Sequence, residues 1–149
     1  MNILMLPLNE VNEENIYFLD SKKNILMDGT FTKLMFMNEW FTMNGIYITF
    51  PIFVQNIEIN PIMGQKHTIT FSVNAHLDVI EKIEAIERAI LSRYGSHKVP
   101  SYNINYSLRM GVFKIYKTIH KNTGFALKIS GIWENANNYG LSYKIVEAI

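Results

Sequence analysis

Hydrophobic and polar side chains alternate along two runs near the end of the chain, Phe125 to Ile129 and Leu141 to Ile145. A period of two is typical of a β-strand that buries one face, so the apolar residues of the first run should point inward and Lys128 outward. The residues between the runs, 134–140, are rich in asparagine and end in glycine, and both residue types favour turns. The stretch therefore predicts a β-hairpin with one apolar face buried in the core and one face that carries lysine and serine, with aromatic residues close by.

Shorter runs of the same kind occur through most of the chain. Asn44-Gly45 is a strong signal for a tight hairpin turn, and Pro51 limits ladder pairing after the run that precedes it. The segment 102–108 fits either a strand or irregular structure. Strands are predicted at 16–19, 33–37, 46–50, 54–59, 66–73 and 111–119.

Between residues 76 and 94 the period of the apolar positions changes from two to about 3.6, which predicts an amphipathic helix. Asn74 is suited to cap the start of this helix, and Gly95 is suited to end it. The opposite face should be acidic and exposed, and should point away from any nucleic acid. The apolar stripe is Val79, Ile83, Ile86, Ile90 and Tyr94, and the acidic residues are Glu81, Glu84 and Glu87.

Many short strands with one well-formed helix predict a mainly β protein, a small closed or half-closed barrel. At 149 residues the chain should form one domain, 1–149, whose hydrophobic core is large enough to fold without disulfides or structural metal ions. The short apolar segment 3–8 fits either an edge strand or an arm on a partner, and 9–15 is polar and acidic as in a loop, so residues 1–15 could form a peripheral arm.

Charge and composition argue against several classes of protein. The net charge is +1, which argues against a protein held on duplex DNA by overall positive charge, although acids and bases can still segregate by face. The absence of cysteine excludes disulfides and thiolate metal sites. The first residues do not resemble a secretory signal, and no apolar run reaches the ~20 residues of a membrane helix. We therefore expect an intracellular protein with no membrane partner.

Catalytic and metal-binding patterns are not evident. The four histidines, His67, His76, His97 and His120, are scattered without metal-ligand spacing. His76 and Asp78 could be taken for a catalytic pair, but capping and solvation explain them better. There is no glycine-rich phosphate loop and no nucleophile elbow. We expect no cofactor, no metal and no enzymatic activity.

Lysines interleaved with aromatic residues on a strand face are suited to a single nucleic-acid strand, because lysine pairs with phosphate and flat rings stack on bases. Tyr47, Tyr116 and Tyr143 are predicted to point outward, and Lys114 and Lys128 fall on adjacent segments and share their outward faces with aromatic residues. Half-exposed tyrosines and solvated lysines are also ordinary on sheets. Trp133 fits a core position equally well, and burial is the commoner outcome for Trp40. The candidate contacts are Lys33, Trp40, Tyr47, Lys114, Tyr116, Lys117, Lys128, Trp133, Tyr143 and Lys144.

Six short segments occur in a fixed order along the chain. The most specific is Leu127-Lys-Ile-Ser-Gly-Ile-Trp-Glu134. The others are Phe41–Tyr47, Ala89–Tyr94, Lys98–Tyr102, Leu108–Ile115 and Tyr139–Lys144. Together they resemble the single-stranded DNA-binding proteins of large double-stranded DNA viruses, including viruses of insects, a family similar in fold to the replication single-strand binding proteins of short-tailed phages.

The resemblance covers about 33–145 and implies an oligonucleotide/oligosaccharide-binding (OB) barrel with a helix inserted between strands. It also implies a location at viral replication sites, with host nucleus and cytoplasm not distinguished, and replication proteins as further partners. Related phage proteins end in an acidic tail that recruits such partners. This chain instead ends Lys144–Ile149 with one acid, and an apolar end is suited to packing on another subunit in a homo-oligomer.

The sequence thus predicts a non-catalytic, sequence-tolerant single-stranded DNA-binding protein that supports viral DNA replication and recombination. Two alternatives stay open. The first is a structural or protein-interaction barrel, such as a virion or assembly component, which near-neutral charge and apolar ends favour. The second is single-stranded RNA as the ligand, because nothing in the sequence distinguishes a 2′-hydroxyl.

Overall fold

The structure is a computed structural model that describes residues 4–23, 28–59, 66–115 and 124–148. Its helices are α1 (Leu77–Tyr94) and α2 (Asn103–Arg109), with 3-10 turns η1 (Leu8–Glu10), η2 (Glu13–Asn15) and η3 (Asn74–His76). Its strands are β1 (Ile16–Phe18), β2 (Lys22–Lys23), β3 (Thr30–Met37), β4 (Thr42–Asn44), β5 (Ile46–Phe50), β6 (Val54–Ile59), β7 (His67–Phe71), β8 (Val99–Ser101), β9 (Val112–Ile115), β10 (Gly124–Glu134) and β11 (Asn138–Ala148).

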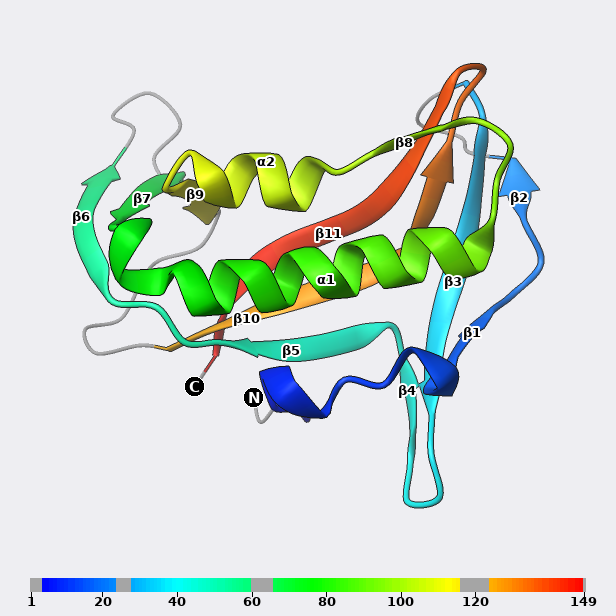
Figure 1. Cartoon of the computed structure of the whole chain (residues 1–149), viewed down its shortest axis with the longest axis horizontal. Helices are drawn as coiled ribbons and strands as arrows, with labels where there is room; N and C mark the ends of the chain where they lie inside the picture. The colour runs from blue at the N-terminus through cyan, green and yellow to red at the C-terminus, as the bar shows by residue number, and fades with distance from the viewer. Residues whose placement is uncertain (1–3, 24–27, 60–65, 116–123, 149) are drawn as a thin grey trace.

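The hairpin of β10 and β11 is the spine of the larger sheet, which confirms the hairpin predicted from the alternation (Figure 1). The first half of β10 pairs with β5 and its second half with β3, while β11 pairs in parallel with β8. Asn135 closes the turn, because its Oδ1 accepts hydrogen bonds from the backbone N–H of Asn137 at 3.0 Å and of Asn138 at 2.7 Å. The asparagine-rich turn is therefore held by its own side chain.

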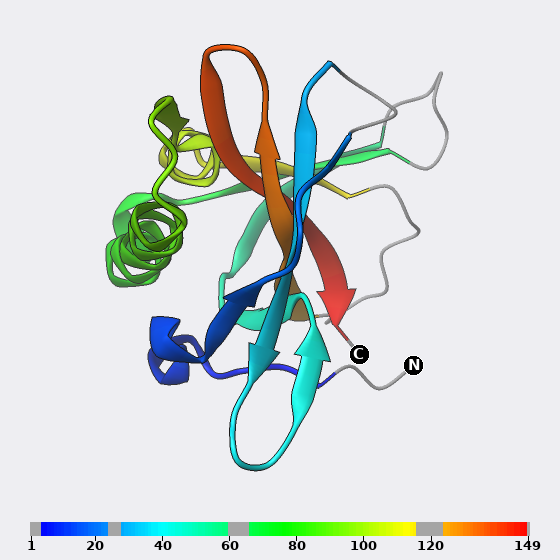
Figure 2. The ribbon, with the colours of Figure 1, turned by 90° about the vertical axis from the view of Figure 1, so that its right-hand side faces the viewer.

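A β-bulge between Ile129 and Gly131 changes which residues of β10 point inward. Before the bulge, odd-numbered residues are buried, and after it Ile132 is fully buried and Trp133 points to the other face. Glycine is required at the bulge, since a Cβ at Gly131 would stand 2.2 Å from the carbonyl oxygen of Thr32. Such bulges bend a strand and increase its twist, and the larger sheet curls into a half-barrel here (Figure 2).

A second sheet, β6–β7–β9, lies beside the larger one, and both described helices pack on the same side (Figures 1 and 2). The core between sheet and helices contains residues such as Ile48, Ile80, Ile90 and Leu127, each at most 1% exposed. The protein is mainly β, with a curled half-barrel sheet and one long helix, so the predicted OB-like fold with a helix inserted at about 76–94 is confirmed.

The ends of α1 show one correct and one wrong prediction. Gly95 ends the helix in the left-handed conformation, with φ 71°, as predicted. Asn74 does not cap it, because η3 precedes the helix and Asn74 lies inside that turn. His76 occupies the N-cap position of α1, but its side chain does not cap the helix and instead ties the segments before it together. Its Nε2 accepts a hydrogen bond from the N–H of Phe53 at 3.0 Å, and its Nδ1 donates to the carbonyl oxygen of Ser72 at 2.7 Å.

The helix α2 replaces the strand or irregular segment expected at 102–108, and its docking also corrects the prediction for Glu87. Glu87 was expected on an exposed acidic face but is 1% exposed. Its carboxylate accepts hydrogen bonds from the N–H groups of Ile104 and Asn105, both at 3.0 Å, at the start of α2. Burial raises the pKa of Glu87, and the two N–H groups oppose that shift. The helical period alone could not show that a second helix covers this position.

The N-terminal segment adds to the edge of β5. Leu6 is buried, its N–H donates to the carbonyl oxygen of Tyr47 at 2.7 Å, and its own carbonyl accepts from the N–H of Thr49 at 2.9 Å. Within the described residues, no helix combines the length and the apolar character that crossing a membrane requires.

Candidate nucleic-acid interface

The larger sheet has an inner face that packs on the helices and an outer face that points the opposite way. Residues directly opposite each other on antiparallel strands share a face, so the pairing register assigns each residue to one of the two. Thr32 and Tyr139 belong to the inner face, because Thr32 bonds to the hydroxyl of Tyr94 and Tyr139 donates to the carbonyl oxygen of Leu91 on α1. Residues next to them along the strands point outward.

Three candidate residues form one row across the outer face. Lys128 on β10 lies directly opposite Tyr47 on β5 and directly opposite Lys144 on β11. The Nζ atom of Lys128 stands 5.4 Å from the centre of the Tyr47 ring, a cation–π distance. Lys144 is exposed, and Tyr47 is half-buried. The structure thus brings together two predicted lysines and one predicted tyrosine from three neighbouring strands.

A second row carries two aromatic rings, seated on glycines. Trp133 on β10 lies opposite Phe31 on β3 and opposite Gly140 on β11. A Cβ at Gly140 would stand 2.8 Å from Cζ2 of Trp133, and one at Gly131 would stand 2.7 Å from Cζ of Phe31. Each ring therefore lies across the sheet where a larger residue would lift it. Both rings are half-buried, so they still meet solvent.

Two more lysines border this second row. Lys22 on β2 lies opposite Phe31, and Lys33 on β3 lies opposite Gly131 at the bulge. Both lysines are exposed. From Lys128 to Trp133 the strand spans about 16 Å, at ~3.3 Å per residue. We call the set Lys22, Phe31, Lys33, Tyr47, Lys128, Trp133 and Lys144 the lysine–aromatic face.

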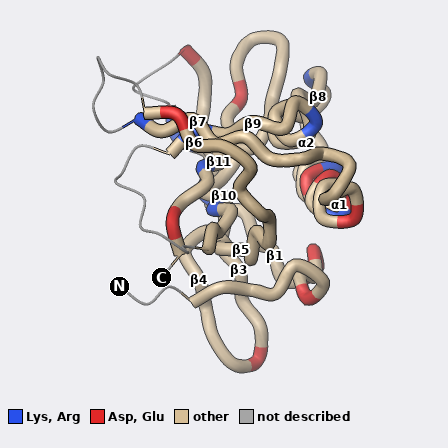
Figure 3. The backbone as a smooth tube through the Cα atoms, turned by 90° about the vertical axis from the view of Figure 1, so that its left-hand side faces the viewer, with Lys and Arg blue, Asp and Glu red and all other residues tan. Residues whose placement is uncertain are grey.

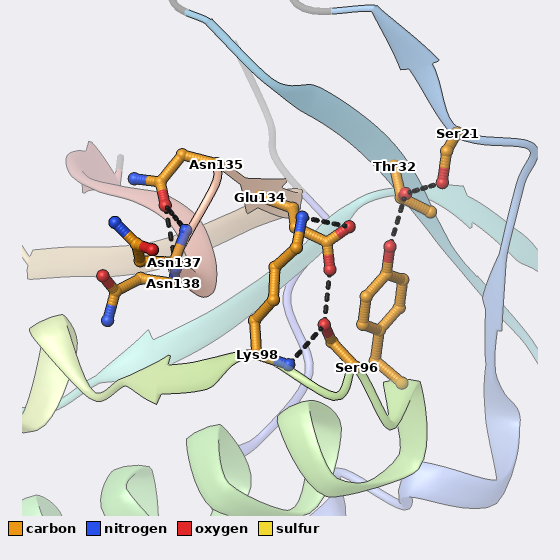
Figure 4. A network of polar contacts seen from close by, with 9 residues as sticks. Ser21, Thr32, Ser96, Lys98, Glu134, Asn135, Asn137 and Asn138 are labelled. Carbon is orange, nitrogen blue, oxygen red and sulfur yellow. Dashed lines mark hydrogen bonds and ion pairs between the residues drawn. The ribbon is translucent and has the colours of Figure 1, made fainter.

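No aspartate or glutamate occupies an outward register position on β3, β5, β10 or β11 within the described residues. Glu134, next to Trp133, is turned to the helix side. It accepts a hydrogen bond from Ser96 Oγ and pairs with Lys98 Nζ at 3.5 Å (Figure 4). Many of the acids instead lie on α1 and on the turns before β1 (Figure 3). The carboxylates of the described strands are therefore kept off the outer face, while the helix side carries both acids and bases, a distribution that the net charge of +1 does not reveal.

The predicted outward orientation of Tyr143 is wrong. Tyr143 lies directly opposite the buried Ile129, is itself half-buried against the core, and donates a hydrogen bond from its hydroxyl to Ser107 Oγ of α2 at 3.1 Å. The parity of β11 explains the error: Tyr143 shares its face with the buried Leu141 and Ile145, whereas Lys144 points outward.

Lys114 does not share a sheet with Lys128, so the two lysines do not form the common surface that was expected of them. Lys114 is on β9, which pairs with β7 in the smaller sheet. It lies opposite Thr68, and Thr68 lies opposite Glu58 on β6. Lys114 is exposed, but its row contains a carboxylate and no ring, so it is outside the lysine–aromatic face.

Three other candidates are separate from that face. Trp40 is 84% exposed at the tip of the β3–β4 hairpin, which projects beyond the sheet (Figures 1 and 2). Tyr116 and Lys117 lie outside the described residues.

Two residues of the lysine–aromatic face were missed by the sequence reasoning. Phe31 could have been found by extending the alternation of β3 backward from Lys33, because the two residues share parity. Lys22 lies in a segment that looks like a turn, and only its pairing with Phe31 places it here.

No group of three or more histidines, aspartates and glutamates comes together to hold a metal ion in the described part of the chain. No family model, curated protein or solved structure matches the chain. The functional argument therefore depends on the geometry of the lysine–aromatic face itself.

Proposed function

We propose that this protein binds single-stranded DNA with little sequence preference and without catalysis. The observation that carries the proposal is a sheet face whose described outward positions carry no carboxylate and on which exposed lysines border two aromatic rings seated on glycines. Half-buried rings that lie over a sheet suit base stacking, which contributes ~1–3 kcal/mol per base, and every base offers a ring face. The contacts need no base-edge donors or acceptors, so sequence preference should be weak.

The lysines determine the expected salt dependence. Four of them, Lys22, Lys33, Lys128 and Lys144, lie on the lysine–aromatic face. If each neutralises one phosphate, the logarithm of the binding constant should fall with the logarithm of salt concentration with a slope of about −3, from ~0.7 per phosphate for single strands. In this role the protein would coat displaced strands during viral DNA replication and recombination, as the resemblance implies.

Fluorescence anisotropy with labelled oligo-dT and a matched duplex, titrated at several salt concentrations, tests the proposal. We expect tight oligo-dT binding, weak duplex binding and the slope above. No oligo-dT binding at low salt, or equal binding of the duplex, contradicts it. A parallel titration with oligo-U compares RNA with DNA, and tighter oligo-U binding would identify RNA as the ligand instead.

Matched charge reversals locate the site. Lys33→Glu changes the lysine–aromatic face, whereas Lys82→Glu makes the same change at an exposed position on α1, on the helix side. Only the first variant should weaken oligo-dT binding. Equal loss in both would show that overall charge, and not this face, attracts the strand.

A protein-interaction role is a second candidate, and one observation favours it. The edge strand β6 is exposed along its whole length and carries Ile57 and Ile59, 43% and 62% exposed, after an 84% exposed Phe53. Exposed apolar edges are templates for pairing with another chain. Stable oligomers in gel filtration combined with no oligo-dT binding would support this function over the first.

A further inference from the structure

A groove of about 380 Å³ lies on the helix side of the molecule, between the N-terminal segment and α1. One wall is the stretch 9–13 with its 3-10 turns, and the other is the α1 segment from Ala85 to Ile90. The volume is at the lower end of the range for ligand sites, ~300–1,000 Å³, which suits an inserted side chain better than a large cofactor.

The floor of the groove is apolar. Ile16 and Ile90 form part of the buried core, and Val11 and Ile86 are half-buried beside them. The groove exists because α1 presents two small residues to it, Ala85 and Ala89, which lie one helical turn apart. Larger side chains at these positions would fill the groove. An apolar side chain that entered the groove would lose its contact with water.

The rim of the groove is acidic. Glu10 and Glu13 both line it, both are exposed, and neither forms an ion pair within the described residues. The other polar residues of the rim are Asn9 and Asn12. A negative rim around an apolar floor favours a ligand that has the opposite charge around an apolar anchor.

We infer that this groove binds a positively charged segment of a partner protein, which inserts one apolar side chain between Val11 and Ala89 and pairs its flanking lysines or arginines with Glu10 and Glu13. The small anchor and the exposed rim fit a short peptide segment, since a buried anchor residue supplies most of the affinity and the rim charges supply orientation.

The groove lies on the opposite side of the sheet from the lysine–aromatic face, because η1, η2 and α1 are all on the helix side (Figure 2). Charge keeps the two surfaces apart: nucleic acid is repelled by the acidic rim, and a basic segment is repelled by the lysines. This inference does not depend on DNA binding, and it stands if the protein binds no nucleic acid.

The probe is a fluorescein-labelled peptide with a single central Phe and two lysines on each side, titrated against the full chain at low salt. Two further peptides serve as controls, one with Ser in place of Phe and one with glutamates in place of the lysines. We expect saturable binding of the first peptide alone, with amide NMR shifts concentrated in 9–16 and 85–90. No binding up to millimolar concentration, or shifts elsewhere, overturns the inference.

Variants separate the groove from general acidity. Ala89→Trp fills the hollow, and the double variant Glu10→Lys/Glu13→Lys reverses the rim. Each change should lower the affinity for the peptide by at least about tenfold, which is the loss typical of an interface anchor. The matched controls are Ala75→Trp and Glu58→Lys, exposed positions away from the groove, which should leave the affinity within about twofold. Both rim positions are exposed, so the rim variant should fold normally. Unchanged peptide affinity in that variant also overturns the inference.

Discussion

The inner and outer faces of the larger sheet are built by the same strands, yet they have different surroundings. On the inner face, Ile129 and Ile132 are fully buried beneath the helix layer. On the outer face, Trp133 and Phe31 are half-buried on glycines, and exposed lysines surround them. Both faces carry large apolar side chains, so hydrophobicity does not distinguish them. The difference is that lysines border the rings of one face and helices cover the other, and this makes one face a core and the other a candidate binding surface.

The largest expected effect is on the inner face. Ile129→Ala should lower the free energy of unfolding by about 2–5 kcal/mol, because it removes buried contacts and leaves a cavity. Oligo-dT affinity of the folded fraction should stay unchanged. Urea unfolding measures the first quantity and anisotropy the second. A variant of normal stability would show that the inner face is not packed as described.

Charge reversal at Lys128 and Lys144 should reduce DNA affinity and leave stability nearly unchanged. Lys128→Glu/Lys144→Glu places two negative charges beside Tyr47 and should weaken oligo-dT binding by roughly 30-fold or more, while unfolding changes by at most about 1 kcal/mol, as is usual for surface substitutions. A variant with wild-type affinity would remove this row from the binding site. The salt slope should become shallower by about 1.4, from ~0.7 per lost phosphate contact.

The aromatic row predicts a smaller loss. Trp133→Ala should weaken oligo-dT binding by about tenfold, within the ~1–3 kcal/mol that one stacked base contributes, and the salt slope should not change. Gly140→Ala should also reduce affinity by displacing the indole, and because its Cβ would stand 2.9 Å from the carbonyl oxygen of Ser101 as well, urea unfolding must accompany the binding measurement. Quenching of tryptophan fluorescence on binding, measured in a Trp40→Phe background so that Trp133 is the one indole left, reports whether a base contacts it.

The buried carboxyl group of Glu87, which joins α1 to α2, should make the free energy of unfolding depend on pH. Its raised folded-state pKa means that the folded protein binds the proton more tightly, so this contribution to stability is full below about pH 4.5 and is lost as pH rises through the folded pKa. Glu87→Gln removes the titration and weakens one hydrogen bond, at a cost of about 1 kcal/mol. The stability advantage of the wild type over this variant should shrink as pH rises, measured by urea unfolding. An advantage that grows with pH would contradict the pKa direction.

Lys114 should give the smallest effect. Lys114→Glu lies in the row with Thr68 and Glu58, outside the lysine–aromatic face, so oligo-dT affinity should change by less than about twofold. Anisotropy compares it with Lys128→Glu, the same change at a strand position with a different neighbourhood. Similar losses in both variants would mean that the bound strand extends across both sheets.

Local signals predicted much of the fold. The hairpin, α1 and its stop at Gly95 follow from periodicity and turn residues, which act over a few positions. The short α2 was missed because its seven residues hold little periodic signal, and it depends on the carboxylate of Glu87 at its start. Tyr143 could have been placed correctly, because it shares parity with Leu141 and Ile145.

By itself, then, the sequence determined which residues alternate and therefore that Lys128 and Tyr47 point away from a core. It could not determine what lies beside them, because cross-strand neighbours are residues far apart in the chain. Only the tertiary structure decided that a bulge turns Trp133 outward over Gly140, that Lys144 joins Lys128 while Lys114 does not, and that an acidic groove forms along α1. The physical reason is that register and sheet assignment follow from how all the strands close around one core.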